Sequence, residues 1–331
     1  MRSERLELAL GSGLAAWPQQ GRILVLRPRA GDDLSALPRD RVQVVTGFRP
    51  DADAFAALGF AVAPLPEGAF AAALVCLPRA RDLARALLAQ ASAAVVPGGP
   101  VLVDGQKTDG VESVWRDLQA AGAAPGPALS KAHGRIFAFA AGADLAAWAA
   151  TRRDIGGFVT APGVFSADGP DPGSVLLAAA LPARLPARVA DLGAGWGYLA
   201  RAVLAREGVA ECHLIEAEAE ALACARQNIA DPRARFHWAD ATRFRPEAPF
   251  GAVVCNPPFH TGREADPGLG LAFLRAAAGM LTTSGTLWLV GNRHLPYEQT
   301  LAALFRDIEE LRGDSRFRLY RASRPIPRRP T

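Results

Sequence analysis

Short apolar runs recur along the chain, and most of them stop at residues that cannot extend a strand, such as glycine and proline. Apolar runs of about four or five residues bounded by turn residues are typical of strands buried on both faces of a parallel sheet. The pattern predicts such strands at Ile23–Leu26, Val42–Val45, Ala73–Cys76, Val101–Val103, Val189–Leu192, Cys212–Ile215, Ala252–Cys255 and Leu287–Val290.

Helices are predicted between several of these strands, at Ala80–Ala93, Tyr198–Arg206 and Ala217–Asn228. Strands that alternate with helices favour a parallel sheet covered by helices, which is an α/β fold. From about Ala140 to Arg152 the chain becomes rich in alanine and then charged, and we interpret this stretch as a connection. The sequence therefore predicts two Rossmann-like α/β domains in tandem, at residues 1–150 and 151–331.

The two halves also align with each other. Ala73–Arg79 aligns with Ala252–Pro258, and Pro97–Gly105 aligns with Thr282–Gly291 with one residue of slack. Such self-similarity predicts a duplicated domain. The copies differ where a ligand would bind, because the first has arginines and a proline where the second has a glycine-rich loop, and Leu77 where the second has Asn256. We expect the N-terminal copy to be degenerate and catalytically inactive.

The composition is that of a globular protein. The chain has 331 residues, of which 50% are hydrophobic, and this is enough for two separate cores. The first residues, Met1–Glu7, are charged and lack the apolar segment of a signal peptide, and no apolar run is long enough to cross a bilayer. We expect a cytoplasmic protein without a membrane partner.

The four cysteines show neither a metal-binding pattern nor a disulfide pattern. Cys76, Cys212, Cys224 and Cys255 each stand alone, mostly inside apolar runs, without a Cys-x-x-Cys pair. We therefore expect buried, reduced thiols and predict no metal site.

Positive charge gathers towards the C-terminal end. The net charge is only +4, but residues 312–331 contain seven arginines and a single acid, Asp314. A basic segment of this kind either contacts the phosphates of a nucleic acid or forms a solvated surface, and the sequence leaves both interpretations open.

A glycine-rich loop follows the strand predicted at Val189–Leu192. The pattern is Asp191-x-Gly193-x-Gly195-x-Gly197, and it lies where a strand passes into a helix. At such a position glycines let a ligand approach the backbone, and the helix N-terminus offers free N–H groups. A dinucleotide-binding loop has its third glycine or alanine at the position of Tyr198, so this spacing disfavours a pyrophosphate ligand.

Two further acids follow at the ends of the next strands. Glu216 lies 25 residues after Asp191, where a carboxylate can accept hydrogen bonds from both ribose hydroxyls, and Asp240 lies 24 residues further on, where it can accept from an adenine amine. Either acid taken alone could be an ordinary surface residue. Three acids at successive strand ends favour S-adenosylmethionine as the ligand.

The sequence Asn256-Pro257-Pro258-Phe259 ends the strand predicted at Ala252–Cys255. Two prolines make this corner rigid, which positions hydrogen-bond acceptors. The Asn256 side-chain oxygen and the Pro257 carbonyl can accept hydrogen bonds from the two protons of a planar exocyclic amine, and Phe259 can stack on a base that has left its helix. The alternative is a loop that merely terminates a strand.

With these motifs, the C-terminal half resembles the RsmC-type ribosomal RNA guanine-N2 methyltransferases and their large-subunit relatives. The resemblance includes Pro162–Gly169, the pattern Asp171-x-Gly173-Ser174, the glycine loop, and Asn256–Gly262. It implies a class I methyltransferase fold and an enzyme that methylates the N2 amine of a guanine in ribosomal RNA, expected to be small-subunit 16S RNA. It also implies that the degenerate N-terminal domain helps RNA binding or supports the fold.

The same resemblance assigns roles to individual residues. Asn256, Pro257 and Phe259 are expected to be catalytic. The residues expected to bind S-adenosylmethionine are Asp191, Gly193, Ala194, Gly195, Glu216, Asp240, Ala241 and Asn256. By the same similarity, the segment from Phe165 to Ser174 would lie over the cofactor or the target, whereas by itself it predicts only a turn and a helix cap.

Other functions share part of this pattern. The Asn-Pro-Pro-aromatic corner also occurs in enzymes that methylate DNA adenine or a glutamine of release factors, so it indicates the reaction better than the substrate. Methylation of large-subunit RNA, methylation of a protein glutamine, and a non-catalytic RNA-binding or assembly role therefore stay open. We expect the partner to be ribosomal RNA or the small ribosomal subunit, and the protein to be a monomer.

Overall fold

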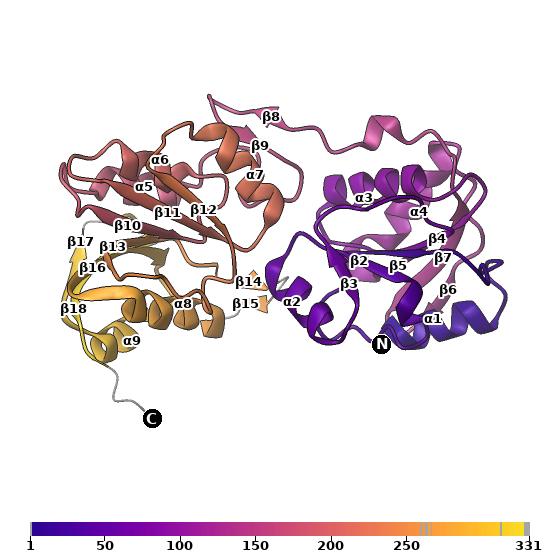
Figure 1. Cartoon of the computed structure of the whole chain (residues 1–331), viewed down its shortest axis with the longest axis horizontal. Helices are drawn as coiled ribbons and strands as arrows, with labels where there is room; N and C mark the ends of the chain where they lie inside the picture. Colours follow the sequence, from indigo (N-terminus) through magenta and orange to yellow (C-terminus); the bar gives the residue numbers. More distant parts are fainter. Residues whose placement is uncertain (1, 259, 262–263, 266, 312, 328–331) are drawn as a thin grey trace. The chain divides into compact units, whose positions relative to one another are not determined.

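The computed structural model describes residues 2–258, 260–261, 264–265, 267–311 and 313–327. The chain divides into two units, Met1–Thr151 and Arg152–Thr331, which are described separately below (Figure 1). None of the helices in the described ranges is both long and apolar enough to span a bilayer.

The first unit is built on a sheet that, within the described residues, has seven strands in the order β3-β2-β1-β4-β5-β7-β6. Its first five strands in this order are parallel, and β7 is antiparallel to both β5 and β6. The strands are β1 Ile23–Leu26, β2 Val42–Val45, β3 Ala61–Ala63, β4 Ala72–Cys76, β5 Pro100–Gln106, β6 Leu129–Lys131 and β7 Gly134–Ala140.

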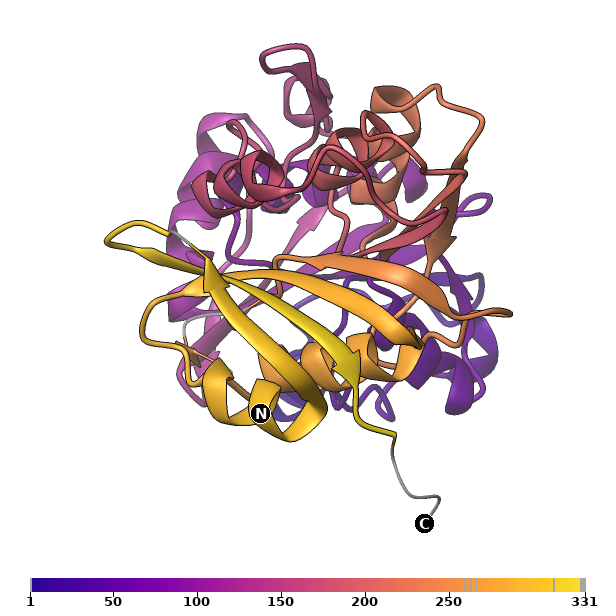
Figure 2. The same ribbon diagram turned by 90° about the vertical axis from the view of Figure 1, so that its left-hand side faces the viewer.

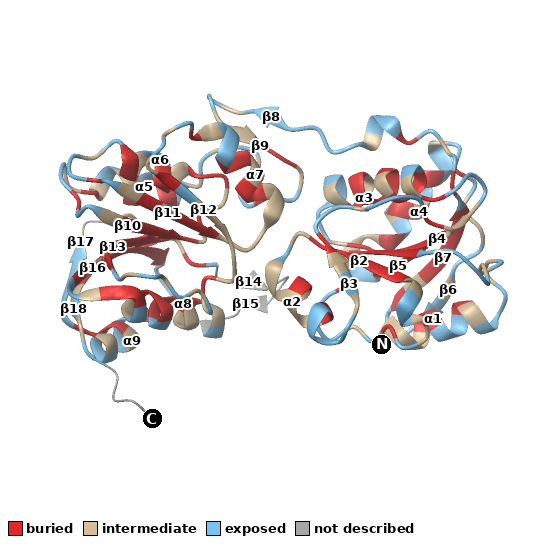
Figure 3. Cartoon of the chain, viewed as in Figure 1, coloured by how far each residue is buried: buried red, intermediate tan, exposed pale blue. Residues whose placement is uncertain are grey.

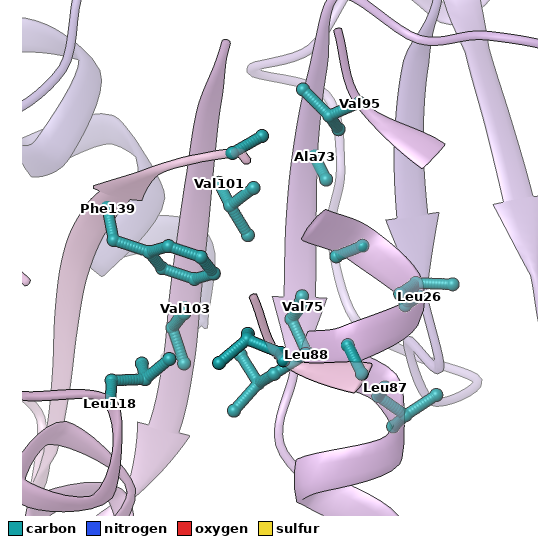
Figure 4. Packing of buried hydrophobic residues seen from close by; sticks show 14 of the residues in the cluster. Leu26, Ala73, Val75, Leu87, Leu88, Val95, Val101, Val103, Leu118 and Phe139 are labelled. Carbon is teal, nitrogen blue, oxygen red and sulfur yellow. The ribbon is translucent and has the colours of Figure 1, made fainter. Parts of the chain in front are cut away.

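Helices cover both faces of this first sheet, and the central strands are buried throughout (Figure 3). One core joins the sheet to α3 and α4, where Leu88 and Leu118 pack near Val75, Val103 and Phe139 (Figure 4). The opposite core joins it to α1 and α2. The helices are α1 Arg2–Gly11, α2 Arg49–Ala57, α3 Arg81–Ala94 and α4 Val111–Ala120, with short 3₁₀ turns at Arg39–Arg41, Lys107–Asp109 and Ala146–Trp148.

The second unit is built on another sheet, for which the described residues give the order β12-β11-β10-β13-β16-β18-β17. Figure 2 shows its C-terminal strands as the yellow ribbons in front. The strands are β10 Arg188–Leu192, β11 Glu211–Glu216, β12 Ala234–Trp238, β13 Phe250–Cys255, β16 Leu281–Asn292, β17 Phe305–Leu311 and β18 Phe317–Pro325. Two small two-stranded ribbons are formed by β8 Arg153–Asp154 with β9 Val159–Thr160, and by β14 His260–Thr261 with β15 Glu264–Ala265.

The helices of the second unit also lie on both faces of its sheet. One core contains the apolar side chains of α5, α6 and α7, and the other contains those of α8 and α9. These helices are α5 Pro172–Ala180, α6 Tyr198–Leu204, α7 Ala219–Asn228, α8 Pro267–Met280 and α9 Tyr297–Leu304.

The two sheets share one topology. In each, the strands read third, second, first, fourth, fifth, seventh and sixth in chain order, and the seventh is antiparallel to its neighbours. β4 and β13, whose sequences align, are both fourth strands, and β5 and β16 are both fifth strands. This shared order confirms the predicted duplication and the α/β fold of two Rossmann-like halves.

The predicted strands are present, although their ends differ from the prediction by a few residues. Leu287–Val290, for example, is the middle of the twelve-residue strand β16. The predicted helix Ala80–Ala93 corresponds to α3, which begins and ends one residue later.

Candidate functional site

The loops that follow β10, β11 and β13 meet at one edge of the second sheet. Leu192, which ends β10, pairs with Ile215 of β11 and with Cys255 of β13. The Cys255 thiol donates a hydrogen bond to the Leu192 carbonyl oxygen over 3.4 Å. In α/β sheets this is the edge at which ligands bind. The residues that come next along the chain, and are therefore side by side at this edge, are Gly193, Glu216 and Asn256.

The glycine loop leaves β10 with backbone angles that favour glycine. Gly193, Gly195 and Gly197 have φ angles of 73°, 55° and 92°, all in the left-handed region. A Cβ atom on Gly193 would lie 3.3 Å from Cε1 of Phe273, whereas a Cβ on Gly195 would meet no atom of the described residues within 4 Å. The loop therefore leaves open space beside Gly195.

The Glu216 carboxylate is tied to this loop. Its Oε2 accepts a hydrogen bond from the Gly195 backbone N–H over 2.8 Å, and its Oε1 accepts one from the Glu218 backbone N–H over 2.7 Å. Burial raises the pKa of Glu216 above its ordinary value, although both N–H groups favour the charged form. Because a carboxylate has about four acceptor sites, each oxygen can still accept a hydrogen bond from a ligand hydroxyl.

Asp191 is a fully buried carboxyl group one residue before the end of β10. Within the described residues neither of its oxygens has a hydrogen-bond partner. Burial, and secondarily the neighbouring Glu216, raise the pKa of Asp191 to about 8; the nearby Ala200 backbone N–H, which does not meet the geometry of a hydrogen bond, offsets only part of this effect. A cationic or N–H group brought beside Asp191 would stabilise its charged form.

Asp240 lies in the loop that follows β12. Its Oδ1 accepts hydrogen bonds from the Thr242 backbone N–H over 2.8 Å and from the Thr242 hydroxyl over 2.7 Å. The Ala239 backbone N–H donates to the Glu216 carbonyl oxygen over 2.9 Å, which brings this loop next to the end of β11. Asp240 and the buried Ala241 therefore continue the row of loops at the same edge.

Asn256 is held through its side-chain nitrogen. Nδ2 donates hydrogen bonds to Oδ2 of Asp171 and to the hydroxyl of Ser174, each over 2.9 Å. The Asn256 side-chain oxygen therefore points away from these two acceptors. Pro257 is buried after it, whereas Phe259, predicted to stack on the target base, lies outside the described residues, and its role stays a prediction.

The segment before the glycine loop contacts both parts of the site. The Trp196 side-chain N–H, in the glycine loop, donates to the Phe165 carbonyl oxygen over 3.0 Å, and Asp171 and Ser174 contact Asn256. The sequence predicted a turn and a helix cap here but did not predict the contact with Asn256. Asp171 and Asn256 are 85 residues apart, and no periodic pattern links residues at that separation.

The C-terminal arginines, whose role the sequence left open, lie largely against acids of the same unit. Arg318 pairs with Glu298 of α9, Arg321 with Glu309 of β17 over 3.3 Å, and Arg324 with Asp307 of β17. Arg312, Arg328 and Arg329 lie outside the described residues. For the three paired arginines, these contacts favour a solvated, locally neutralised surface.

The cysteines and histidines do not form a metal site in the described part of the chain. All four cysteines are free and buried, as predicted. No cluster of three or more His, Cys, Asp or Glu side chains among the described residues suits a metal ion. His213 and His237 do meet on neighbouring strands, with ring nitrogens 3.0 Å apart, and burial lowers the pKa of each below its ordinary value.

These groups suit S-adenosylmethionine. The open space beside Gly195 leaves room for a ligand against the loop, and the Glu216 oxygens can accept from ribose hydroxyls. Asp191 is a buried acid that lacks a hydrogen-bond donor within the described residues, and a cationic methionine end carries such donors.

Comparison with known proteins decides the family. The family described as "Methyltransferase small domain" matches residues 156–321. A "Ribosomal RNA small subunit methyltransferase C" of Pseudomonas paraeruginosa is 33% identical over 273 residues, which cover 78% of this chain and 81% of that protein. The chain belongs to the RsmC-type methyltransferase family. The resemblance predicted from the motifs is thereby confirmed.

Further comparisons extend this result. An RsmC-type structure, the "T. Thermophilus 16S rRNA N2 G1207 methyltransferase (RsmC) in complex with AdoMet and Guanosine", is similar with a TM-score of 0.78 and 25% identity, over 94% of this chain and 90% of that one. Outside the small-subunit enzymes, a "Ribosomal RNA large subunit methyltransferase G" of Ectopseudomonas mendocina is 36% identical over 166 residues. That match covers 49% of this chain and only 44% of the relative.

Proposed function

We propose that this protein transfers the methyl group of S-adenosylmethionine to the exocyclic N2 amine of a guanine in 16S ribosomal RNA. One observation carries the proposal: Asn256 lies beside the glycine loop and Glu216, at the carboxyl ends of neighbouring strands. A hydrogen-bond acceptor for the target amine is therefore adjacent to the residues that suit the cofactor. Membership of the RsmC-type family supports the choice of RNA, and so does the similar T. thermophilus structure, which contains AdoMet and guanosine.

The residues of the site have separate roles in the proposed reaction. Asp191, Gly193, Ala194, Gly195, Glu216, Asp240 and Ala241 hold the cofactor, with Asn256 at the border between cofactor and target. When bound, S-adenosylmethionine supplies an electrophilic methyl group: the amine nitrogen bonds to its carbon as the carbon–sulfur bond breaks, sulfur keeps the electron pair, and the amine loses one proton to water.

The protein's part in the chemistry is orientation. The nitrogen of a guanine amine is a poor nucleophile because its lone pair is conjugated with the ring. Hydrogen bonds donated by its two N–H groups to Asn256 Oδ1 and to the Pro257 carbonyl oxygen fix the amine and increase the electron density on its nitrogen. Phe259 stacks on the target base once that base has left the RNA helix.

The test is transfer of labelled methyl to separated small subunits, large subunits and naked ribosomal RNA, followed by nucleoside analysis. We expect label in N2-methylguanosine from small-subunit RNA and none with Asn256→Ala. No label in any RNA, from enzyme that still binds the cofactor, would overturn the proposal.

Methylation of large-subunit RNA is the second candidate, and the match to methyltransferase G favours it. Label confined to large subunits would establish it. Release factors added as a further substrate test whether the protein methylates a protein glutamine. Binding of RNA without transfer to any substrate would indicate an assembly role.

We infer a supporting role for residues 1–150, which form the degenerate copy, in RNA binding or in stabilising the catalytic domain at 151–331.

Because the proposed substrate is ribosomal RNA, we propose that the protein acts in the cytoplasm. We also propose that it acts as a monomer. A measured mass of twice that of the chain would contradict the last point.

A further inference from the structure

The side-chain amide of Asn256 has both of its N–H groups directed at acceptors. One lies against Oδ2 of Asp171 and the other against the Ser174 hydroxyl, each at 2.9 Å. A rotated amide would bring its oxygen against the Asp171 carboxylate oxygen and so exchange a hydrogen bond for a repulsion, whereas the Ser174 hydroxyl can accept or donate and fits either orientation. Asp171 therefore fixes which end of the Asn256 amide faces the cofactor edge, and that end is the oxygen; Ser174 holds the nitrogen in place.

Asp171 and Ser174 are themselves held by the start of α5. Asp171 is the residue before the helix, and the Oδ2 atom that accepts from Asn256 also accepts from the Ser174 backbone N–H over 2.9 Å. Pro172 occupies the first turn, where a missing N–H is tolerated. One carboxylate oxygen thus caps the helix and holds Asn256, and the N-terminal charge of the helix stabilises it.

Gly173 between them lets this helix start pack closely against β18. A Cβ at this position would lie 3.1 Å from the Asp171 Oδ2 atom and 3.0 Å from Cε1 of Phe317 in β18. The motif Asp171-x-Gly173-Ser174 therefore places a carboxylate and a buried hydroxyl at fixed positions, using a helix start packed against the sheet.

We propose that Asp171 and Ser174 are positioning residues, which orient the Asn256 amide so that its oxygen accepts from the target amine. The inference rests on the proposed function, in which Asn256 receives that amine. Hydrogen bonds donated from Nδ2 to a carboxylate also shift electron density towards the amide oxygen, which makes it a stronger acceptor. The competing account is that Asp171 only caps α5 and Ser174 only fills space.

Substitutions at position 171 separate the two accounts. A serine hydroxyl caps a helix about as well as a carboxylate but is too short to reach Asn256, whereas an asparagine keeps an oxygen at the same reach. Under the positioning account, Asp171→Ser lowers kcat for methyl transfer about 10- to 100-fold, and Asp171→Asn restores most of it. Under the capping account, Asp171→Ser is as active as the wild type.

Ser174→Ala provides the cleaner test, because it removes one acceptor and leaves the helix cap in place. We expect its kcat to fall about ten-fold, with KM for RNA and cofactor changed by less than about two-fold. Ser12→Ala, a change of the same size at the exposed residue that follows α1 in the first unit, is the control and should leave both constants unchanged.

A readout that does not depend on activity comes from the amide itself. The sequence contains three asparagines, Asn228, Asn256 and Asn292, so a sample labelled with ¹⁵N-asparagine shows three side-chain amides. Asn228 donates to the carbonyl oxygens of Val159 and Trp196 and serves as an internal reference. We expect the Asn256 side-chain protons to exchange slowly with water in the full-length wild type and at least about ten-fold faster in Ser174→Ala and Asp171→Ser, with Asn228 unchanged.

The two readouts distinguish failure of this inference from failure of the proposed function. If the wild type methylates no RNA, the proposed function fails, while slow exchange that both variants abolish still supports the positioning of Asn256. Fast exchange of the Asn256 amide in the wild type would overturn the inference. Variants in which the Asn256 side-chain protons exchange faster while kcat equals that of the wild type would also overturn it.

Discussion

At the scale of single residues, the Asp191 carboxyl group lies one residue before the end of β10, is fully buried, and has no hydrogen-bond partner among the described residues. Burial without a partner disfavours the charged form of a carboxyl group. A buried acid of this kind has a measurable effect on stability.

We predict that Asp191 makes the unbound protein less stable as the pH rises. Its pKa is 3.8 ordinarily and about 8 when folded, so between these values the folded state holds a proton that the unfolded state has lost. The free energy of unfolding therefore falls with pH, by up to about 1.4 kcal/mol per unit from this group.

Asp191→Asn, which removes the titrating group, tests this effect through urea unfolding at pH about 5 and about 7.5. The stability of the variant relative to the wild type should be greater at the higher pH by about 1 kcal/mol or more. An equal difference at both pH values would show that Asp191 does not titrate in this range. Glu207→Gln, at an exposed position between α6 and β11, is a suitable control for a change of charge.

At the scale of elements, α1 contacts the edge of the first sheet that corresponds to the candidate site of the second sheet. Arg5 of α1 is buried and donates to both oxygens of Asp104 in β5, at 2.5 and 3.0 Å, and Arg2 donates to the same carboxylate over 2.6 Å. Asp104 pairs with Cys76 at the end of β4, the strand that corresponds to β13. In the first unit, the edge that corresponds to the candidate site is therefore occupied by two arginines of α1, which bind Asp104.

We predict that Asp104→Ala destabilises the first unit by about 3–5 kcal/mol, because it leaves buried guanidinium groups without their carboxylate. Arg81→Ala breaks an exposed ion pair with Asp117 and should cost about 1 kcal/mol or less. Unfolding in denaturant measures both variants. Equal losses would mean that burial of the Arg5–Asp104 pair contributes nothing.

Such elements were hard to predict because their partners are distant or their pattern is weak. Arg5 and Asp104 are 99 residues apart. β17 is an edge strand with five consecutive exposed residues, so its sequence lacks the apolar run that marked the central strands. In β18 the arginines recur at every third residue, at 318, 321 and 324, and the sequence indicated a basic face or tail without predicting the strand. Strands buried on both faces were predicted because their apolar runs are continuous.

At the scale of the whole molecule, each unit has its own sheet and its own cores on both faces. The duplication was predictable, since fourth and fifth strands of the two halves align. The order of the last two strands was not, because β6 and β17 lack a continuous apolar run. All the predicted cofactor residues belong to the second unit.

We therefore predict two transitions in calorimetric unfolding, only one of which responds to S-adenosylmethionine. At a ligand concentration about 100-fold above Kd, binding adds about 2.7 kcal/mol to the stability of the unit that binds it. The other transition should move with Asp104→Ala and not with the ligand. A single transition that shifts as a whole with the ligand would contradict this independence.

At the site we propose separate roles for neighbouring loops: the glycine loop and Glu216 hold the cofactor, and Asn256 orients the amine. The most direct test is calorimetric titration of Asn256→Ala with S-adenosylmethionine, with methyl transfer measured on the same sample. We expect Kd within about three-fold of the wild type, or about 0.7 kcal/mol, and transfer lowered by at least about 10²-fold. Loss of cofactor binding in parallel with loss of transfer would contradict the assignment.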